Sequence, residues 1–277
     1  MKVFLSVDLE GISGITSLRQ ISSTGPEYGH ARGLMIEDVN AAVAGALEGG
    51  ATEVLVRDAH GPATNILPDR LHPGARLMAG WMPALDMLQG LDSTFAVAFF
   101  IGYHPGPPAA GGVLSHTYSM DTIREVRING LSAGESAINA LQAATHNVPV
   151  GLVTGERGLR EEIEPILAQA EFVVTKTGYG YQSALLEPVE SCRREIRAAA
   201  ARCVQKISGG HRYPLYRPEE PLHVEIEFHR AEAAAAARLV PCVELTSTRS
   251  VVFGCPSAQE FVTVFQLLCQ VLYGLKT

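Results

Sequence analysis

Acidic and histidine side chains follow three of the apolar runs in this sequence. Asp8 and Glu10 end the first run, Asp58 and His60 end the second, and His104 ends the third. Two neighbouring carboxylates resist ionisation unless a cation lies between them. Imidazole together with carboxylate suits Zn²⁺, with Mn²⁺ or Co²⁺ as further candidates. Each residue taken alone also fits a helix cap or a solvated side chain, but three such run ends together indicate a metal site.

The elements that carry these residues explain why they would converge. Residues two apart in a strand point to the same face, so Asp8 and Glu10 can present both carboxylates to one spot. In an open α/β sheet, ligands bind outside the carboxyl ends of the strands. If the three runs are parallel neighbours, their polar ends meet at one edge of the sheet.

His116 and Glu135 are two further candidates for the site, and the sequence around each also fits an ordinary structural role. His116 follows a loop rich in glycine and proline, where a histidine could shuttle protons or stabilise an oxyanion near neutral pH. A surface histidine beside a hairpin fits the same pattern. Glu135 stands in the first turn of a predicted helix, which is also an ordinary favourable place for an acid against the helix dipole.

The chain alternates between short β-type runs and helical stretches. The predicted strands span residues 3–9, 53–58, 76–79, 96–103, 149–154 and 171–177. The predicted helices span residues 27–50, 82–90, 159–170 and 188–207, and another begins near residue 133. This alternation is typical of an α/β fold with a largely parallel sheet flanked by helices.

The pattern is interrupted once and then changes. Asn129-Gly130 after a β-branched run predicts a hairpin that leaves the parallel core. After residue 209 the sequence predicts a strand over 222–228, a helix over 231–239, strand structure over 243–253 and a long helix over 257–275. We therefore predict a metal-binding catalytic α/β domain over residues 1–209 and a smaller C-terminal α+β part over residues 210–277.

Composition excludes several classes of protein. Of the 277 residues, 47% are hydrophobic and 18% are charged, which allows a sizeable core and argues against disorder. The net charge of −7 disfavours nucleic acid and anionic membrane surfaces as partners. No signal peptide or membrane-length apolar run is visible. Five cysteines without a C-x-x-C pair favour reduced thiols and predict a cytoplasmic location.

Short motifs in a fixed order provide a more specific signal. They are Asp8-Leu-Glu10-Gly-Ile-Ser-Gly14, Asp58-Ala-His60, Leu71-His72-Pro73, Gly102-Tyr-His104, Ser115-His116, Ile128-Asn129-Gly130 and Gly134-Glu135. In this order they resemble the D-aminopeptidase (DppA-type) family of dinuclear zinc peptidases, over nearly the whole chain. The resemblance is strongest up to about residue 139 and loosest after residue 209.

The resemblance implies a hydrolase, a zinc-dependent aminopeptidase for short peptides with a free N-terminus, such as D-Ala-D-Ala. It implies two zinc ions per subunit, a ring-shaped homodecamer, and His116 as the catalytic histidine. The metal ligands that it implies are Asp8, Glu10, His60, His104 and Glu135. In the corresponding mechanism Asp8 bridges the ions, a hydroxide held between them attacks, and His116 stabilises the oxyanion or protonates the leaving amine.

Two segments depart from the family pattern and keep alternatives open. Gly155-Glu156-Arg157 stands where the family often has Gly-Asp-Asp, and residues 177–182 are rich in glycine and tyrosine. If these segments shape the substrate pocket, an aminopeptidase for L-peptides is an alternative. A non-catalytic metal- or peptide-binding protein is the alternative from another class. Nucleotide-binding and serine hydrolase motifs are lacking.

Overall fold

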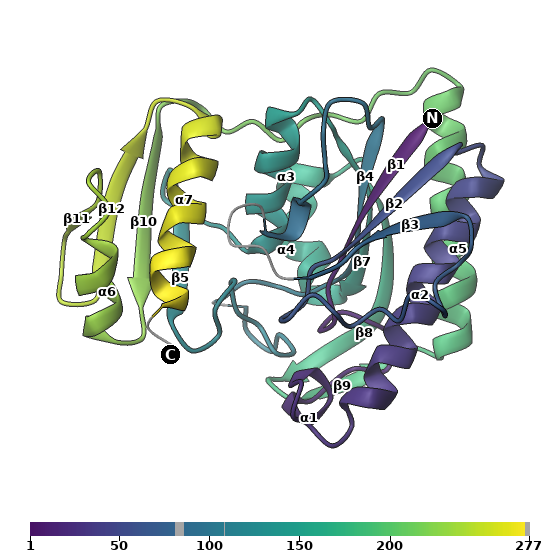
Figure 1. Ribbon diagram of the computed structural model, residues 1–277, viewed down its shortest axis with the longest axis horizontal. Helices are drawn as coiled ribbons and strands as arrows, with labels where there is room; N and C mark the ends of the chain where they lie inside the picture. The colour runs from purple at the N-terminus through teal and green to yellow at the C-terminus, as the bar shows by residue number, and fades with distance from the viewer. Residues whose placement is uncertain (81–85, 108, 275–277) are drawn as a thin grey trace.

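The main sheet of the protein is largely parallel (Figure 1). The structure, a computed structural model, describes residues 1–80, 86–107 and 109–274. Within these residues the sheet has the order β3-β2-β1-β4-β7-β8-β9, and only β9 runs antiparallel to its neighbour. Its strands are β1 (Lys2–Val7), β2 (Glu53–Asp58), β3 (Ala75–Met78), β4 (Val97–Tyr103), β7 (Val150–Glu156), β8 (Glu171–Gly180) and β9 (Ser183–Leu186). The predicted fold class is confirmed.

Helices cover both faces of this sheet because its central strands are apolar on both faces. Leu5 of β1 packs into a core that includes α2 (Tyr28–Glu48) and α5 (Val189–Ser208). Phe4, which points to the opposite face, packs with α3 (Glu135–Thr145) and α4 (Arg157–Leu167). Side chains of adjacent strand residues alternate in direction, so β1 is buried on both sides.

The order of the strands creates a switch point beside β1. The chain moves from β1 outward to β2 and β3 on one side, and then places β4 on the other side of β1. From β1 the chain continues to α2 on one face of the sheet, and from β4 it continues toward α3 on the other face, so a crevice forms at the carboxyl ends of these strands. The polar residues that follow β1, β2 and β4 meet in this crevice.

A second, antiparallel sheet has the order β11-β12-β10-β5-β6. It combines β5 (Ile123–Ile128) and β6 (Leu131–Ser132) with β10 (Leu222–Phe228), β11 (Glu244–Leu245) and β12 (Ser250–Cys255). The helices α6 (Ala231–Ala237) and α7 (Ala258–Tyr273) pack into its core, and α7 also contacts α3. The Asn129-Gly130 hairpin thus leaves the parallel core, as predicted, and pairs with a strand that lies after residue 209.

Some local predictions differ from the structure. The short helix predicted over 82–90 falls partly outside the described residues, and Asp86–Leu88 form a single 3₁₀ turn, η1. The strand structure predicted over 243–253 is two strands, β11 and β12, separated by a turn. The short helix α1 (Leu18–Ile21) and the edge strand β9 were not predicted, because neither carries a periodic apolar pattern long enough to recognise.

The close approach of β4 to the residues that follow β1 requires Gly102. It has φ +73°, and a Cβ atom there would lie 2.4 Å from the backbone oxygen of Asp8. Replacing Gly102 with alanine is expected to lower the free energy of unfolding by about 3 kcal/mol or more, because backbone strain and a backbone clash add. Denaturation in urea measures this loss.

Gly130 provides the matched control for that substitution. Its φ is +79°, and nothing lies within 4 Å of the corresponding Cβ position. Gly130→Ala should cost only the left-handed backbone strain, about 1–2 kcal/mol. Equal losses in the two variants would show that the approach at Gly102 is not tight.

Candidate metal and active site

The structure brings the six predicted site residues together at the carboxyl edge of the main sheet. Asp8 and Glu10 follow β1, His60 follows β2 and His104 follows β4. Glu135 is the first residue of α3, and His116 lies in the connection between β4 and β5. The side chains of His60 and His116 retain 11% and 13% exposure, and the other four are buried. The site is therefore shielded, with both histidines facing its open side.

Asp8 lies between two groups of side chains. On one side, His60 Nδ1 lies 3.2 Å from Asp8 Oδ1 and 3.0 Å from Glu10 Oε2. On the other side, His104 Nε2 lies 3.4 Å from Asp8 Oδ2 and 3.5 Å from Glu135 Oε1. The two oxygens of one carboxylate thus face two separate histidine–carboxylate pairs. We call these the Glu10–His60 half and the His104–Glu135 half of the site.

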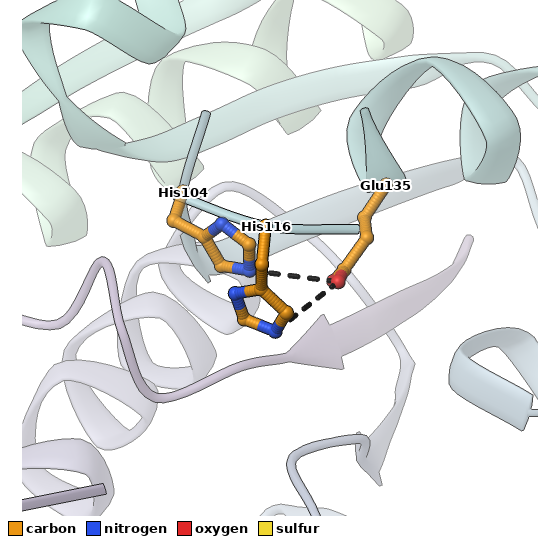
Figure 2. A group of neighbouring side chains, drawn as sticks. All are labelled: His104, His116 and Glu135. Carbon is orange, nitrogen blue, oxygen red and sulfur yellow. Dashed lines mark ion pairs between the residues drawn. The ribbon is translucent and has the colours of Figure 1, made fainter. Parts of the chain in front are cut away.

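His116 lies beside His104 and Glu135 in the second half of the site (Figure 2). Its ring stacks on that of His104, with centroids 4.2 Å apart, and its Nε2 lies 3.8 Å from Glu135 Oε1. Tyr118 closes this side of the site. Its backbone N–H donates to Glu135 Oε1 at 2.6 Å, its hydroxyl donates to Asn139, and its ring packs edge-on against Phe265 of α7. The carboxylate of Glu135 is thereby held in place.

Backbone carbonyls fix the orientation of all three imidazoles. His60 Nε2–H donates to Ile21 O at 2.9 Å and His104 Nδ1–H donates to Pro105 O at 3.0 Å. His116 Nδ1–H donates to Leu114 O at 2.8 Å. In the neutral ring the other nitrogen then carries the lone pair, and in each case this nitrogen faces the carboxylates. Metal-binding histidines are oriented by outer hydrogen bonds of this kind.

The charges in the cluster are strongly coupled. Burial, followed by the charge of Glu10, raises the pKa of Asp8 to about 7. Burial opposes the charged form of His104, but Glu135 and Asp8 raise its pKa to about 10. Burial likewise opposes ionisation of Glu10, but His60 lowers its pKa well below the usual value. Burial and the adjacent His104 lower the pKa of His116. Three buried carboxylates therefore depend on positive charge placed among them.

A divalent cation fits this donor set. Asp8 Oδ2, Glu10 Oε2 and His104 Nε2 are buried polar atoms without a hydrogen-bond partner among the described residues. The ligand atoms of Asp8, Glu10 and His104 lie within 4.8 Å of one another, and so do those of His104, His116 and Glu135. Nitrogen and oxygen donors of this kind are those that zinc prefers. The grouping also makes His116 a possible ligand.

An outer layer of residues holds the loops of the site. The Asp58 carboxylate accepts from the backbone of Asn65 and Ile66, which shapes the loop after His60. Lys176 Nζ donates to Glu10 O and Ile15 O, both at 2.6 Å. The Lys176 side chain is fully buried and is not among the described residues that line the cavity over the site, so it supports the segment after β1. Asp58 belongs to the Asp58-Ala-His60 motif, which was the available signal for its position.

A cavity of about 440 Å³ opens over the site. Asp8, Glu10, His60, His116 and Glu135 line it, and Tyr273 at the end of α7 contributes to its wall. Glu156 and residues 177–182, which depart from the family pattern, are not among the described residues that line it. Glu156 is instead buried and accepts from the backbone N–H of Val113.

Comparisons with known proteins show which family and which structures the whole chain resembles. The D-aminopeptidase family model matches residues 1–267. The chain is 33% identical to a D-aminopeptidase of Bacillus subtilis (strain 168) over 272 residues, which are 97% of this chain and 95% of that protein. It is also similar to the solved structure of the Zn-dependent D-aminopeptidase DppA from Bacillus subtilis, a self-compartmentalizing protease. The TM-score is 0.91 at 29% identity, over 99% of this chain and 98% of the other.

Proposed function

The chain belongs to the D-aminopeptidase family and is a metallo-aminopeptidase, and we propose that it cleaves short peptides of D-amino acids, such as D-Ala-D-Ala, at their free N-terminus. The observation that carries the proposal is the orientation of three imidazoles, by backbone carbonyls, toward three buried carboxylates. This arrangement lies at the base of a cavity large enough for a dipeptide.

We assign two zinc ions to the two halves of the site. Glu10 and His60 would hold one ion, His104 and Glu135 would hold the other, and Asp8 would contribute one carboxylate oxygen to each. Zinc, when bound, polarises a carbonyl group and lowers the pKa of water so that hydroxide is available near neutral pH. The positive charge of the zinc ions would then compensate the negative charge of the carboxylates, as the burial of these groups requires.

His116 is proposed as the proton carrier of the reaction. Its Nδ1–H is committed to Leu114 O, so proton exchange is confined to Nε2, which faces the site. A lowered pKa leaves this nitrogen unprotonated at neutral pH, when it can accept a proton. The same nitrogen can afterwards deliver the proton to the leaving amine or donate a hydrogen bond to the oxyanion.

Hydrolysis of D-Ala-D-Ala and of L-Ala-L-Ala by the same preparation tests the proposal. The protein is stripped with a chelator and restored with zinc, and released amino groups are detected with ninhydrin. We expect zinc-dependent cleavage of the D-dipeptide only. Cleavage of the L-dipeptide alone would support the zinc-dependent peptidase activity but would refute the proposed preference for D-amino acids. A zinc-loaded protein that cleaves neither dipeptide, nor any member of a wider peptide panel, would indicate a binding protein.

Assembly and location complete the proposal. Because the similar DppA is self-compartmentalizing, we propose that this chain also forms a homo-oligomer, with the homodecamer of the family as the expected form. All five cysteines are free thiols, and four of them are buried, which supports a reducing, cytoplasmic location. Among the described residues, no helix combines the length and apolar character needed to cross a bilayer.

A further inference from the structure

The loop after His104 and the segment before Glu135 lie backbone against backbone. A Cβ atom at Gly106 would be 2.7 Å from Gly134 Cα, and one at Gly134 would be 3.0 Å from Gly106 N. Side chains at these two positions would therefore push the segments apart. Gly106 lies two residues after His104, and Gly134 directly precedes Glu135, so this contact sets the separation of two proposed ligands.

Glu162 of α4 contacts both segments at this point. Its Oε2 accepts a hydrogen bond from the backbone N–H of Gly106 at 2.7 Å. Its Oε1 is shielded from solvent and would lie 2.4 Å from a Cβ atom on Gly134. The neighbouring acids Glu161 and Glu164 are exposed. Among these three acids, Glu162 is thus the one whose carboxyl group contacts the backbone next to His104 and Glu135.

A carboxylate in this place has a physical effect on both segments. Burial raises the pKa of Glu162 to about 7, so above neutral pH its ionised carboxylate is a charged acceptor, which makes a stronger hydrogen bond than a neutral one and holds the Gly106 backbone firmly. Gly134 is the N-cap of α3, and negative charge near a helix N-terminus is favourable. Both effects restrain the distance between His104 and Glu135 through the backbone of Gly106 and Gly134.

We propose that Glu162 is a positioning residue that holds His104 and Glu135 at the separation required for one of the two metal ions. The inference rests on the proposed function, since it assumes two zinc ions. It is specific to the His104–Glu135 half, because the Glu10–His60 half is held by other residues, among them Lys176 and Asn65.

Titration of zinc against a chromogenic chelator tests the inference. Partners that orient metal ligands are typically worth about 10- to 100-fold in metal affinity. Glu162→Gln should therefore lower the affinity for one zinc ion about 10-fold and leave the affinity for the other unchanged. Glu162→Ala should lower the affinity for the same ion further. Glu162→Gln has nearly the shape of the original side chain, so it serves as the folded variant if Glu162→Ala is unstable. Glu164→Gln, an exposed change on the same helix, should leave both affinities unchanged.

The outcomes separate the inference from the function on which it rests. Wild-type protein that binds fewer than two zinc ions would overturn both. Two zinc ions in the wild type, with unchanged affinities in Glu162→Gln, would overturn only the role of Glu162. An equal loss of affinity for both zinc ions, together with a lower unfolding temperature, would assign Glu162 a general structural role and would also overturn the inference.

Discussion

Replacing His104 with alanine is expected to remove zinc from the His104–Glu135 half of the site and to abolish measurable peptidase activity. His104 is buried, and its Nε2 faces both Asp8 and Glu135, so its removal takes away the nitrogen donor that lies between these two carboxylates. If metal stabilises the transition state by several kcal/mol, the loss in kcat is at least about 1,000-fold. Glu10→Ala should act in the same way on the other half. Metal analysis after chelation and reloading, together with dipeptide hydrolysis, measures both effects.

The control for this prediction is His30→Ala, because His30 is exposed on α2 and is not among the described residues that line the cavity over the site. This variant should keep the full zinc content and full activity. A His104→Ala protein that still binds two zinc ions per subunit would refute the assignment of His104. A Glu10→Ala protein that still binds two zinc ions per subunit would refute the assignment of Glu10 as a metal ligand.

Replacing His116 with alanine is expected to leave both zinc ions in place and to reduce turnover by at least about 100-fold. The reason is that one nitrogen of His116 is bound to the backbone while the other faces the cavity, which suits proton transfer better than structural support. Zinc stoichiometry and kcat, determined on the same sample, distinguish the two roles of the residue.

The structure makes that distinction necessary, since His116 lies close enough to His104 and Glu135 to act as a third ligand. Loss of one zinc ion from His116→Ala would show that it is a ligand and would contradict the catalytic assignment. Full activity with full zinc content would exclude both roles. His30→Ala again provides the comparison.

The sequence predicted the parallel core well because local patterns determine it. The predicted strand over 53–58 matches β2 in full, and the polar ends of β1, β2 and β4 meet as their spacing indicated. Asp8, Glu10, His60 and His104 could be identified from strand ends alone. Residues two apart in a strand share a face, and parallel neighbours share an edge, so no knowledge of distant contacts was required.

Glu135 and Glu162 could not be identified in this way. Glu135 has the ordinary pattern of an acid at a helix N-terminus, and only family resemblance singled it out. Its place in the site depends on the contact between Gly106 and Gly134, which are distant in sequence. Glu162 lies between exposed acids of an amphipathic helix and carries no local signal. The pairing of β5 with β10 is likewise a long-range event that periodicity does not report.

The connection between α7 and the site has a consequence for the order of events at the ribosome. Tyr118, which holds Glu135, packs against Phe265, and β5 pairs with β10. Both supporting elements are synthesised long after the ligands from β1, β2 and β4. Contacts between distant parts of a chain form only when both parts are available. A nascent chain therefore carries the metal-binding side chains of β1, β2 and β4 before the elements that support Glu135 have been synthesised, so we expect the reaction centre to become ordered only after α7 has left the ribosome.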